Sequence, residues 1–343
     1  MRSDTALLLS GIGRAYADSD NITYPADRGV WAEAPEVLRE RVFMVGDITV
    51  RVEIDWRPIA TEMLRQARYT AREYQKLPKR LKDRDGRRFD TFRLPAVVTE
   101  IGRHRRHRTP VLDLLRLAIH DSYLILNITV PGTFSAAQIR VESERYPYPV
   151  PMRSELFEDA WIVAIHQHWP PIAPLQVGDV AKWYDRLGIG TTQVATSRIA
   201  KALFSTYHAS QIVREDPTVV IWLAQCLESL FGVPAALSRN ILQARAFALF
   251  GEPVKTKLVM KELKEFYEAR NSFAHGGAAI LHPLANEILD EAVDEALVRW
   301  LQPAEFAASL VVAALQRHVQ EGLQEIKWSE SMVPVPLSVS AGA

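Results

Sequence analysis

With 343 residues, 48% of them hydrophobic, the chain is long enough for two or three soluble globular domains. Its 41 basic and 41 acidic residues cancel, so the net charge does not mark the whole chain as a polyanion binder. No apolar stretch approaches the roughly 20 residues of a membrane span. The single cysteine, Cys226, excludes internal disulfides and cysteine-based zinc sites. We therefore expect a cytoplasmic protein without a membrane segment.

Residues 1–150 predict a small α+β domain. Segment 42–56 has the pattern of a β-hairpin, because two β-prone runs flank Gly46 and Asp47. An amphipathic helix is predicted over 58–77, where Pro58 suits the first helical position. Further along the same half, a helix is predicted over 111–118 and a strand over 122–130, which the Pro131-Gly132 pair would stop.

A basic window lies between these elements. From Lys76 to Arg108 there are 12 Lys or Arg residues against 4 acidic ones. Such a local excess suits contacts with phosphates, and a solvated loop or helix face is the alternative. The candidate nucleic-acid-binding residues in it are Lys79, Arg80, Arg87, Arg88, Arg105 and Arg106.

Strand signals disappear from about residue 178 onward. Proline and glycine breaks separate six predicted helices, at 194–214, 217–231, 237–250, 256–275, 284–301 and 303–323. The predicted fold class is therefore an α+β N-terminal domain followed by an all-α helical bundle over 178–325. Segment 151–177 is predicted to be the linker and 326–343 a disordered tail.

The predicted helix 256–275 carries the most informative side chains of the chain. Tyr267, Asn271 and His275 recur every four residues, and Arg270 lies beside this row on a helix. One face therefore offers a cation, an amide and an imidazole. Gly276 and the glycine after it predict the end of the helix, where free carbonyls favour a protonated imidazole.

This helix, together with the segment 223–231 about forty residues upstream, resembles the HEPN superfamily and within it the Apea-like branch. The resemblance covers roughly residues 178–323. It implies a short all-α bundle in which Arg270, Asn271 and His275 form the catalytic motif. It also implies a homodimer in which two motifs face each other and cut RNA without a metal or other cofactor, although some members of the family are inactive.

The residues themselves predict a partner for Arg270. Val259, Leu263 and Phe266 form an apolar stripe, and Arg270 falls in the same stripe. A guanidinium there needs an anion, either a protein carboxylate or a substrate phosphate. Glu228, the only charge between positions 216 and 239, is the natural internal candidate. This ion pair can be purely structural or can hold the guanidinium in place for a phosphate.

Metal-independent RNA cleavage assigns a role to each residue of the helix. His275 would act as base or acid, Arg270 would stabilise charge on the phosphate, and Asn271 would orient the imidazole or contact the phosphate. One copy offers one such histidine for two proton transfers, which favours a two-fold dimer. Tyr267 would line the cleft, stack on a base or belong to the core.

We therefore expect an endoribonuclease that uses the RNA 2′-hydroxyl as nucleophile, in stress response or defence against foreign elements, with RNA, a second copy and a regulatory protein as partners. One alternative is an inactive helical module that binds RNA, a nucleotide or a partner protein. Another places nucleic-acid binding in the basic window, with the helical half as a dimeriser. A metal site at His166 and His168, which would alternate along a strand, is disfavoured because no acidic or cysteine ligand is near.

Overall fold

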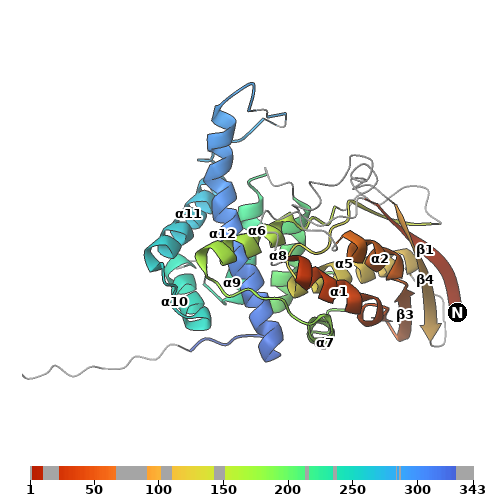
Figure 1. The fold of residues 1–343 in the computed structure, drawn as a ribbon. Helices are drawn as coiled ribbons and strands as arrows, with labels where there is room; N and C mark the ends of the chain where they lie inside the picture. The colour runs from red at the N-terminus through yellow and green to blue at the C-terminus, as the bar shows by residue number, and fades with distance from the viewer. Residues whose placement is uncertain are drawn as a thin grey trace, which may run out of the picture.

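The computed structural model describes most of the chain (Figure 1). The described residues are 2–10, 23–66, 91–101, 110–142, 151–212, 216–234, 238–282, 284–285 and 287–329. All six basic residues predicted to bind nucleic acid, Lys79, Arg80, Arg87, Arg88, Arg105 and Arg106, lie outside this part of the chain. That prediction therefore remains one from the sequence.

A curled antiparallel sheet occupies one end of the molecule (Figure 1). Its strands lie in the order β2-β3-β4-β1-β5. Their bounds are β1 Arg2–Ser10, β2 Glu40–Val45, β3 Ile48–Ile54, β4 Phe92–Ile101 and β5 Gln138–Val141. The central pair joins the first strand to the fourth over nearly its whole length, from the partners Arg2 and Thr99 to Leu9 and Phe92.

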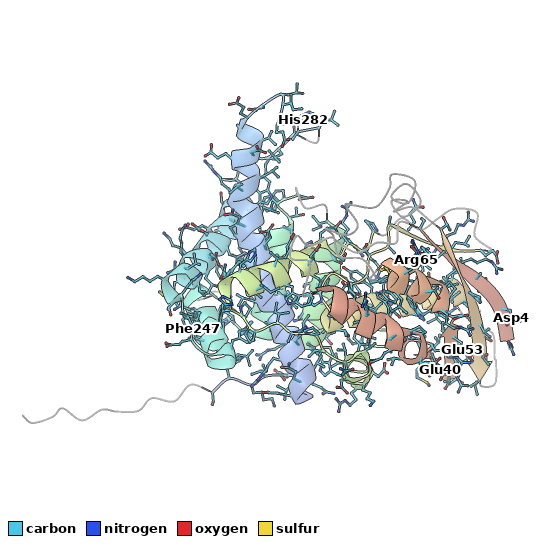
Figure 2. All side chains as sticks on the ribbon, viewed as in Figure 1. Asp4, Glu40, Glu53, Arg65, Phe247 and His282 are labelled. Carbon is cyan, nitrogen blue, oxygen red and sulfur yellow. The ribbon has the colours of Figure 1, made fainter. Side chains whose placement is uncertain are left out.

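The predicted hairpin is confirmed by β2 and β3, which pair from Glu40 with Glu53 to Val45 with Ile48. Side chains in β3 alternate strictly between buried and partly exposed, as expected when one face of a sheet is covered. Gly46 adopts a φ of +62° between the strands, a conformation that glycine tolerates best. Figure 2 shows Glu40 and Glu53 on these neighbouring strands.

Three helices cover the sheet: α1 Thr23–Val37, α2 Arg57–Gln66 and α5 Val111–Thr129. The second and third contact strands directly, and α1 packs against both of them. Phe134 joins this layer, with its ring edge-on to Trp31 at 5.9 Å and to Trp56 at 5.8 Å between ring centroids. Helix α2 confirms the start of the helix predicted over 58–77, whose part beyond residue 66 lies outside the described residues.

The strand predicted over 122–130 is wrong, because helix α5 continues through it to Thr129. All residues of α5 from Asp121 to Thr129 are buried, so this part of the helix has no exposed polar face and loses the period that would distinguish it from a strand. Buried Asn127 ends the helix by donating from Nδ2 to the Phe134 carbonyl at 2.8 Å and accepting from the Gly132 amide at 3.2 Å.

Seven further helices complete the described part of the chain. They are α6 Glu155–Gln167, α7 Val177–Arg186, α8 Arg198–Gln211, α9 Val219–Leu230, α10 Ser238–Phe250, α11 Thr256–Ala274 and α12 Ala292–Glu321. Helices α8 to α11 confirm the corresponding predictions. The two helices predicted over 284–301 and 303–323 are instead one helix that contains Pro303, so the proline did not end it. His166 lies in α6 and His168 at its C-terminal cap, so the strand expected there is also wrong.

The predicted fold class, an α+β domain followed by a separate all-α bundle, is wrong. The protein is a mixed α/β fold in which one continuous set of buried side chains runs from the sheet through to α12. Helix α12 contacts α5 and α7 on one side and α6, α9 and α11 on the other. The segment 151–177, for which we expected a linker, contains α6 packed against α12.

The described start of the expected C-terminal tail also joins the core. Trp328 stacks on Phe231 with 6.4 Å between ring centroids, and the guanidinium of Arg245 lies 5.3 Å from its ring centroid. Residues 330–343 lie outside the described part. The physical reason for the corrected fold class is therefore packing. Helices that are buried on nearly every side, such as α12, need neighbours from both halves of the chain.

One polar side chain joins the two halves inside this core. Gln316 of α12 is 2% exposed, donates from Nε2 to the Ile128 carbonyl at 2.9 Å and accepts from the Ala173 amide at 3.1 Å. Without this amide, the carbonyl of buried Ile128 would lose its partner away from water, which costs about 1–3 kcal/mol, whereas the amide of exposed Ala173 could turn to solvent.

We expect Gln316→Met, which keeps the size of the side chain, to lower the free energy of unfolding by about 1–3 kcal/mol, because it leaves the buried Ile128 carbonyl without a partner. Urea denaturation measures this loss. The matched control is Gln320→Met, one turn further along α12 at an exposed position, where the change should stay within about 0.5 kcal/mol. Equal stabilities of the two variants would contradict this role for Gln316.

Candidate functional site

Helix α11 is amphipathic, which fixes the orientation of the predicted site residues. Val259, Leu263 and Phe266 are buried and face α9 and α12. The opposite side carries i,i+4 ion pairs, including Lys264 Nζ with Glu268 Oε1 at 3.5 Å, of the kind that stabilises exposed helix surfaces. The C-terminal turn of α11 is therefore placed by the burial of its earlier turns.

The helix ends where the glycine pair predicts. His275 is the C-terminal cap residue, with φ −109° and ψ 13°, and Gly276 takes the left-handed conformation at φ +73°. The Gly277 amide then donates to the Ser272 carbonyl at 2.8 Å. These bonds satisfy carbonyls of the last turn and fix the point at which His275 leaves the helix.

Arg270 is held by two neighbours at this end of α11. Its Nη2 lies 3.7 Å from Glu228 Oε1 on α9, which confirms the predicted ion pair, and its Nη1 donates to Asn271 Oδ1 at 2.9 Å. The side chains of Arg270 and Glu228 are 30% and 16% exposed. The guanidinium thus has a carboxylate on its inner side, at ion-pair distance but without a hydrogen bond to it, and part of the guanidinium stays open to solvent.

His275 and Asn271 are both exposed, one turn apart on the same side of the helix. Asn271 uses its carboxamide oxygen for Arg270, which leaves its amino group free to donate. The His275 backbone amide donates to the Asn271 carbonyl at 3.0 Å, but no side-chain hydrogen bond joins the two residues in the described structure. The expected orientation of the imidazole by the Asn271 carboxamide is therefore not formed. The three residues nevertheless present a cation, an amide and an open imidazole within two turns.

Tyr267 belongs to the core. It is 6% exposed, and its ring meets Phe266 with 5.5 Å between centroids. Of the three interpretations of this residue, its burial favours packing in the core over lining a cleft or stacking on a base.

The cavity nearest to the C-terminal turn of α11 is not lined by the three predicted site residues. A cavity of about 430 Å³ is lined by Ser272 and Phe273 of this helix and by Trp300 and Pro303 of α12. Arg270, Asn271 and His275 do not line it. In a single copy of the chain, these three residues therefore line no described cavity. A cleft around them would have to be completed by a second molecule.

The other titratable candidates lie elsewhere. His208 stacks on Trp222 with 4.1 Å between ring centroids, away from α11. Burial raises the pKa of the Cys226 thiol to about 12, so this side chain stays protonated as a core residue. In the described part of the chain, no group of three or more His, Cys, Asp or Glu side chains is placed to hold a metal ion.

Sequence reasoning missed a buried polar cluster formed by β2, α5 and α7. Arg41 of β2 donates from Nη2 to Asp121 Oδ2 of α5 at 3.1 Å, and Tyr184 of α7 donates to Asp121 Oδ1 at 2.7 Å. A cavity of about 610 Å³ opens beside this cluster. The sequence feature that could have indicated this cluster is Asp121, an acidic residue in a mostly apolar segment. Its partners Arg41 and Tyr184 are 80 and 63 residues away in the sequence.

Comparisons of the chain with protein-family models, with curated proteins and with solved structures find no match. None of the helices, as far as the chain is described, is both long and apolar enough to cross a bilayer. The resemblance to HEPN proteins therefore rests on the residues of α9 and α11 alone.

We expect a double-mutant cycle of Arg270→Met and Glu228→Gln to give a coupling energy of about 1 kcal/mol, because the pair is partly shielded from water. Urea denaturation of the four proteins measures it. The control cycle uses the exposed pair of Lys264 and Glu268 on the same helix, for which about 0.3–0.5 kcal/mol is expected. A coupling at Arg270 no larger than in this control would show that Glu228 does not anchor the guanidinium.

Proposed function

We propose that the protein is a metal-independent endoribonuclease whose site is built from Arg270, Asn271 and His275. The observation that carries the proposal is the combination of an open imidazole with a guanidinium that is anchored by Glu228 yet still partly exposed. An ion pair that served only the core would have no need of the exposed amide and imidazole in the following turn.

The proposed reaction is a transesterification within the RNA strand. The ribose 2′-oxygen attacks the adjacent phosphorus, the bond from phosphorus to the 5′-oxygen breaks, and the products end in a 2′,3′-cyclic phosphate and a 5′-hydroxyl. His275 takes the proton from the 2′-hydroxyl or gives one to the leaving oxygen. Arg270 binds the phosphate through its planar donors and stabilises the charge that develops there.

Asn271 has a free amino group in this arrangement, because its oxygen accepts from Arg270. It can therefore donate to a phosphate oxygen, or to the imidazole after a side-chain rotation. In either role it ties the position of the guanidinium to that of the substrate.

A second copy would complete this site. One chain supplies a single His275 for two proton transfers, and its three site residues lie outside the described cavities. A two-fold dimer with the ends of two α11 helices facing each other would provide the second imidazole and turn open surface into a cleft. We propose RNA as substrate, a homodimer, a regulatory protein partner and a cytoplasmic location, in stress response or defence.

We expect His275→Ala to reduce cleavage of single-stranded RNA in the presence of EDTA by at least about 100-fold, because a proton-transfer group is lost. Gel electrophoresis measures the rate, and mass spectrometry identifies the 2′,3′-cyclic phosphate. Arg270→Ala should cause a loss of similar size. Replacing each 2′-hydroxyl of the RNA by hydrogen should abolish cleavage by the wild type.

The matched control is His166→Ala, which removes another exposed histidine from the last turn of a helix, α6. This variant should cut RNA at the wild-type rate. Cleavage that survives in His275→Ala, or that disappears equally in His166→Ala, would refute the assignment.

A second candidate function is a catalytically silent helical module that binds RNA, a nucleotide or a partner protein. The ion pair between Arg270 and Glu228 favours it, since this contact alone gives the arginine a structural role. The two candidates differ in cleavage: a silent module should show none even as wild type, whereas loss of the ion pair on replacing Arg270 should lower the melting temperature under either candidate. An active-site histidine, in contrast, should be nearly neutral for stability.

A further inference from the structure

The cavity of about 610 Å³ lies far from α11, between α5, the end of α7, α8 and the loop 189–193. Its size falls in the range of small-molecule sites in proteins. The loop is fixed to the β2–β3 hairpin, because Thr191 donates from its hydroxyl to the Met44 carbonyl at 3.0 Å. The cavity is therefore bounded by the sheet layer on one side and by the helical layer on the other.

The inner wall of this cavity is a buried polar cluster in which one guanidinium contacts two carboxylates. Asp121 is 5% exposed and receives hydrogen bonds from Arg41 and Tyr184. Arg41 also donates to Asp185 at 2.6 Å from Nη1 to Oδ1. At the outer wall, Arg116 and Asp113 form an ion pair at 3.3 Å. The cations described in or behind the wall thus have protein partners, and an anionic ligand would meet no counter-ion reserved for it.

The side walls combine flat aromatic surfaces with neutral hydrogen-bonding groups. His120 lies edge-on to Tyr207 with 5.5 Å between ring centroids, and both line the cavity with Phe204. Burial lowers the pKa of His120 to about 4, so at neutral pH one ring nitrogen donates and the other accepts. Burial also raises the pKa of Tyr207 well above its ordinary value, so its hydroxyl stays neutral.

We propose that this cavity is a binding site for an uncharged, planar, hydrogen-bonding small molecule of the nucleobase or nucleoside class. Aromatic and aliphatic side chains, Phe204, Tyr207 and Leu117, would cover the faces of a flat heterocycle. The imidazole of His120 and the carboxamides of Gln193 and Gln211 would pair with its polar edge. The site lies on elements other than α9 and α11, so the proposal stands independently of RNA cleavage.

The test is isothermal titration calorimetry of the full chain with adenosine, guanosine, cytidine and uridine as separate probes. We expect at least one of them to bind with a dissociation constant on the order of 100 µM, as is usual for an unmodified ligand of this size. Leu117→Trp, which fills the cavity, should abolish binding. The matched control Leu289→Trp, at a position 82% exposed and away from the cavity, should leave it unchanged.

A second variant and a charged ligand complete the test. His120→Phe keeps a flat ring but removes the ring nitrogens that would pair with the ligand's polar edge. It should weaken binding about tenfold, even if the larger change at Leu117 prevents folding. Adenosine 5′-monophosphate should bind no more tightly than adenosine, because the described cations of the wall are paired. Failure of all four nucleosides to bind, binding that neither cavity variant alters, or much tighter binding of the monophosphate would overturn the proposal.

Discussion

The structure depends on two helical segments that are buried on nearly every side, the second half of α5 and the second half of α12. A helix of this kind is stable in water only when neighbours cover its whole circumference. The sheet and α1 cover α5 from one side, while α6, α9 and α11 cover α12 from the other. The two helices also touch each other, so neither half of the chain has a closed core alone. Gln316 marks this junction, because its amide bonds backbone groups that lie between the two layers.

This constraint also places the candidate site. Helix α11 is held against α9 and α12 by its apolar stripe, and the stripe runs on to Arg270, where Glu228 supplies the carboxylate. The helix then ends at His275, whose imidazole is exposed. Beyond it, the chain and the first turns of α12 project from the body, with His282 at the far end (Figure 2). The buried part of α11 thus fixes the cation, while the end of the helix presents the imidazole at the surface, where a second copy and an RNA strand can reach it.

The sequence predicted correctly those features that short sequence patterns or the scarcity of charge in an apolar segment determine. The β2–β3 hairpin follows from its turn residues and alternation, and the pairing of Glu228 with Arg270 follows from one acid and one base in apolar surroundings. The rest depends on contacts between distant parts of the chain. A fully buried helix such as the end of α5 has no polar face to mark its period, so composition alone favoured a strand there. The cluster at Asp121 was missed because Arg41 lies 80 residues away in the sequence. The separation into two domains failed for the same reason, since only tertiary packing shows that α12 serves both halves.

The most direct test of the proposed site is NMR spectroscopy of the histidine ring protons during titration with a single-stranded 2′-O-methyl RNA. This RNA keeps the phosphates but has no 2′-hydroxyl, so binding is observed without cleavage. The His275→Ala and His166→Ala variants assign the two resonances that matter. We expect the His275 signal to shift in a saturable manner while the signal of exposed His166 stays in place. RNA binding that leaves the His275 signal unmoved would contradict a role for the end of α11 in RNA cleavage.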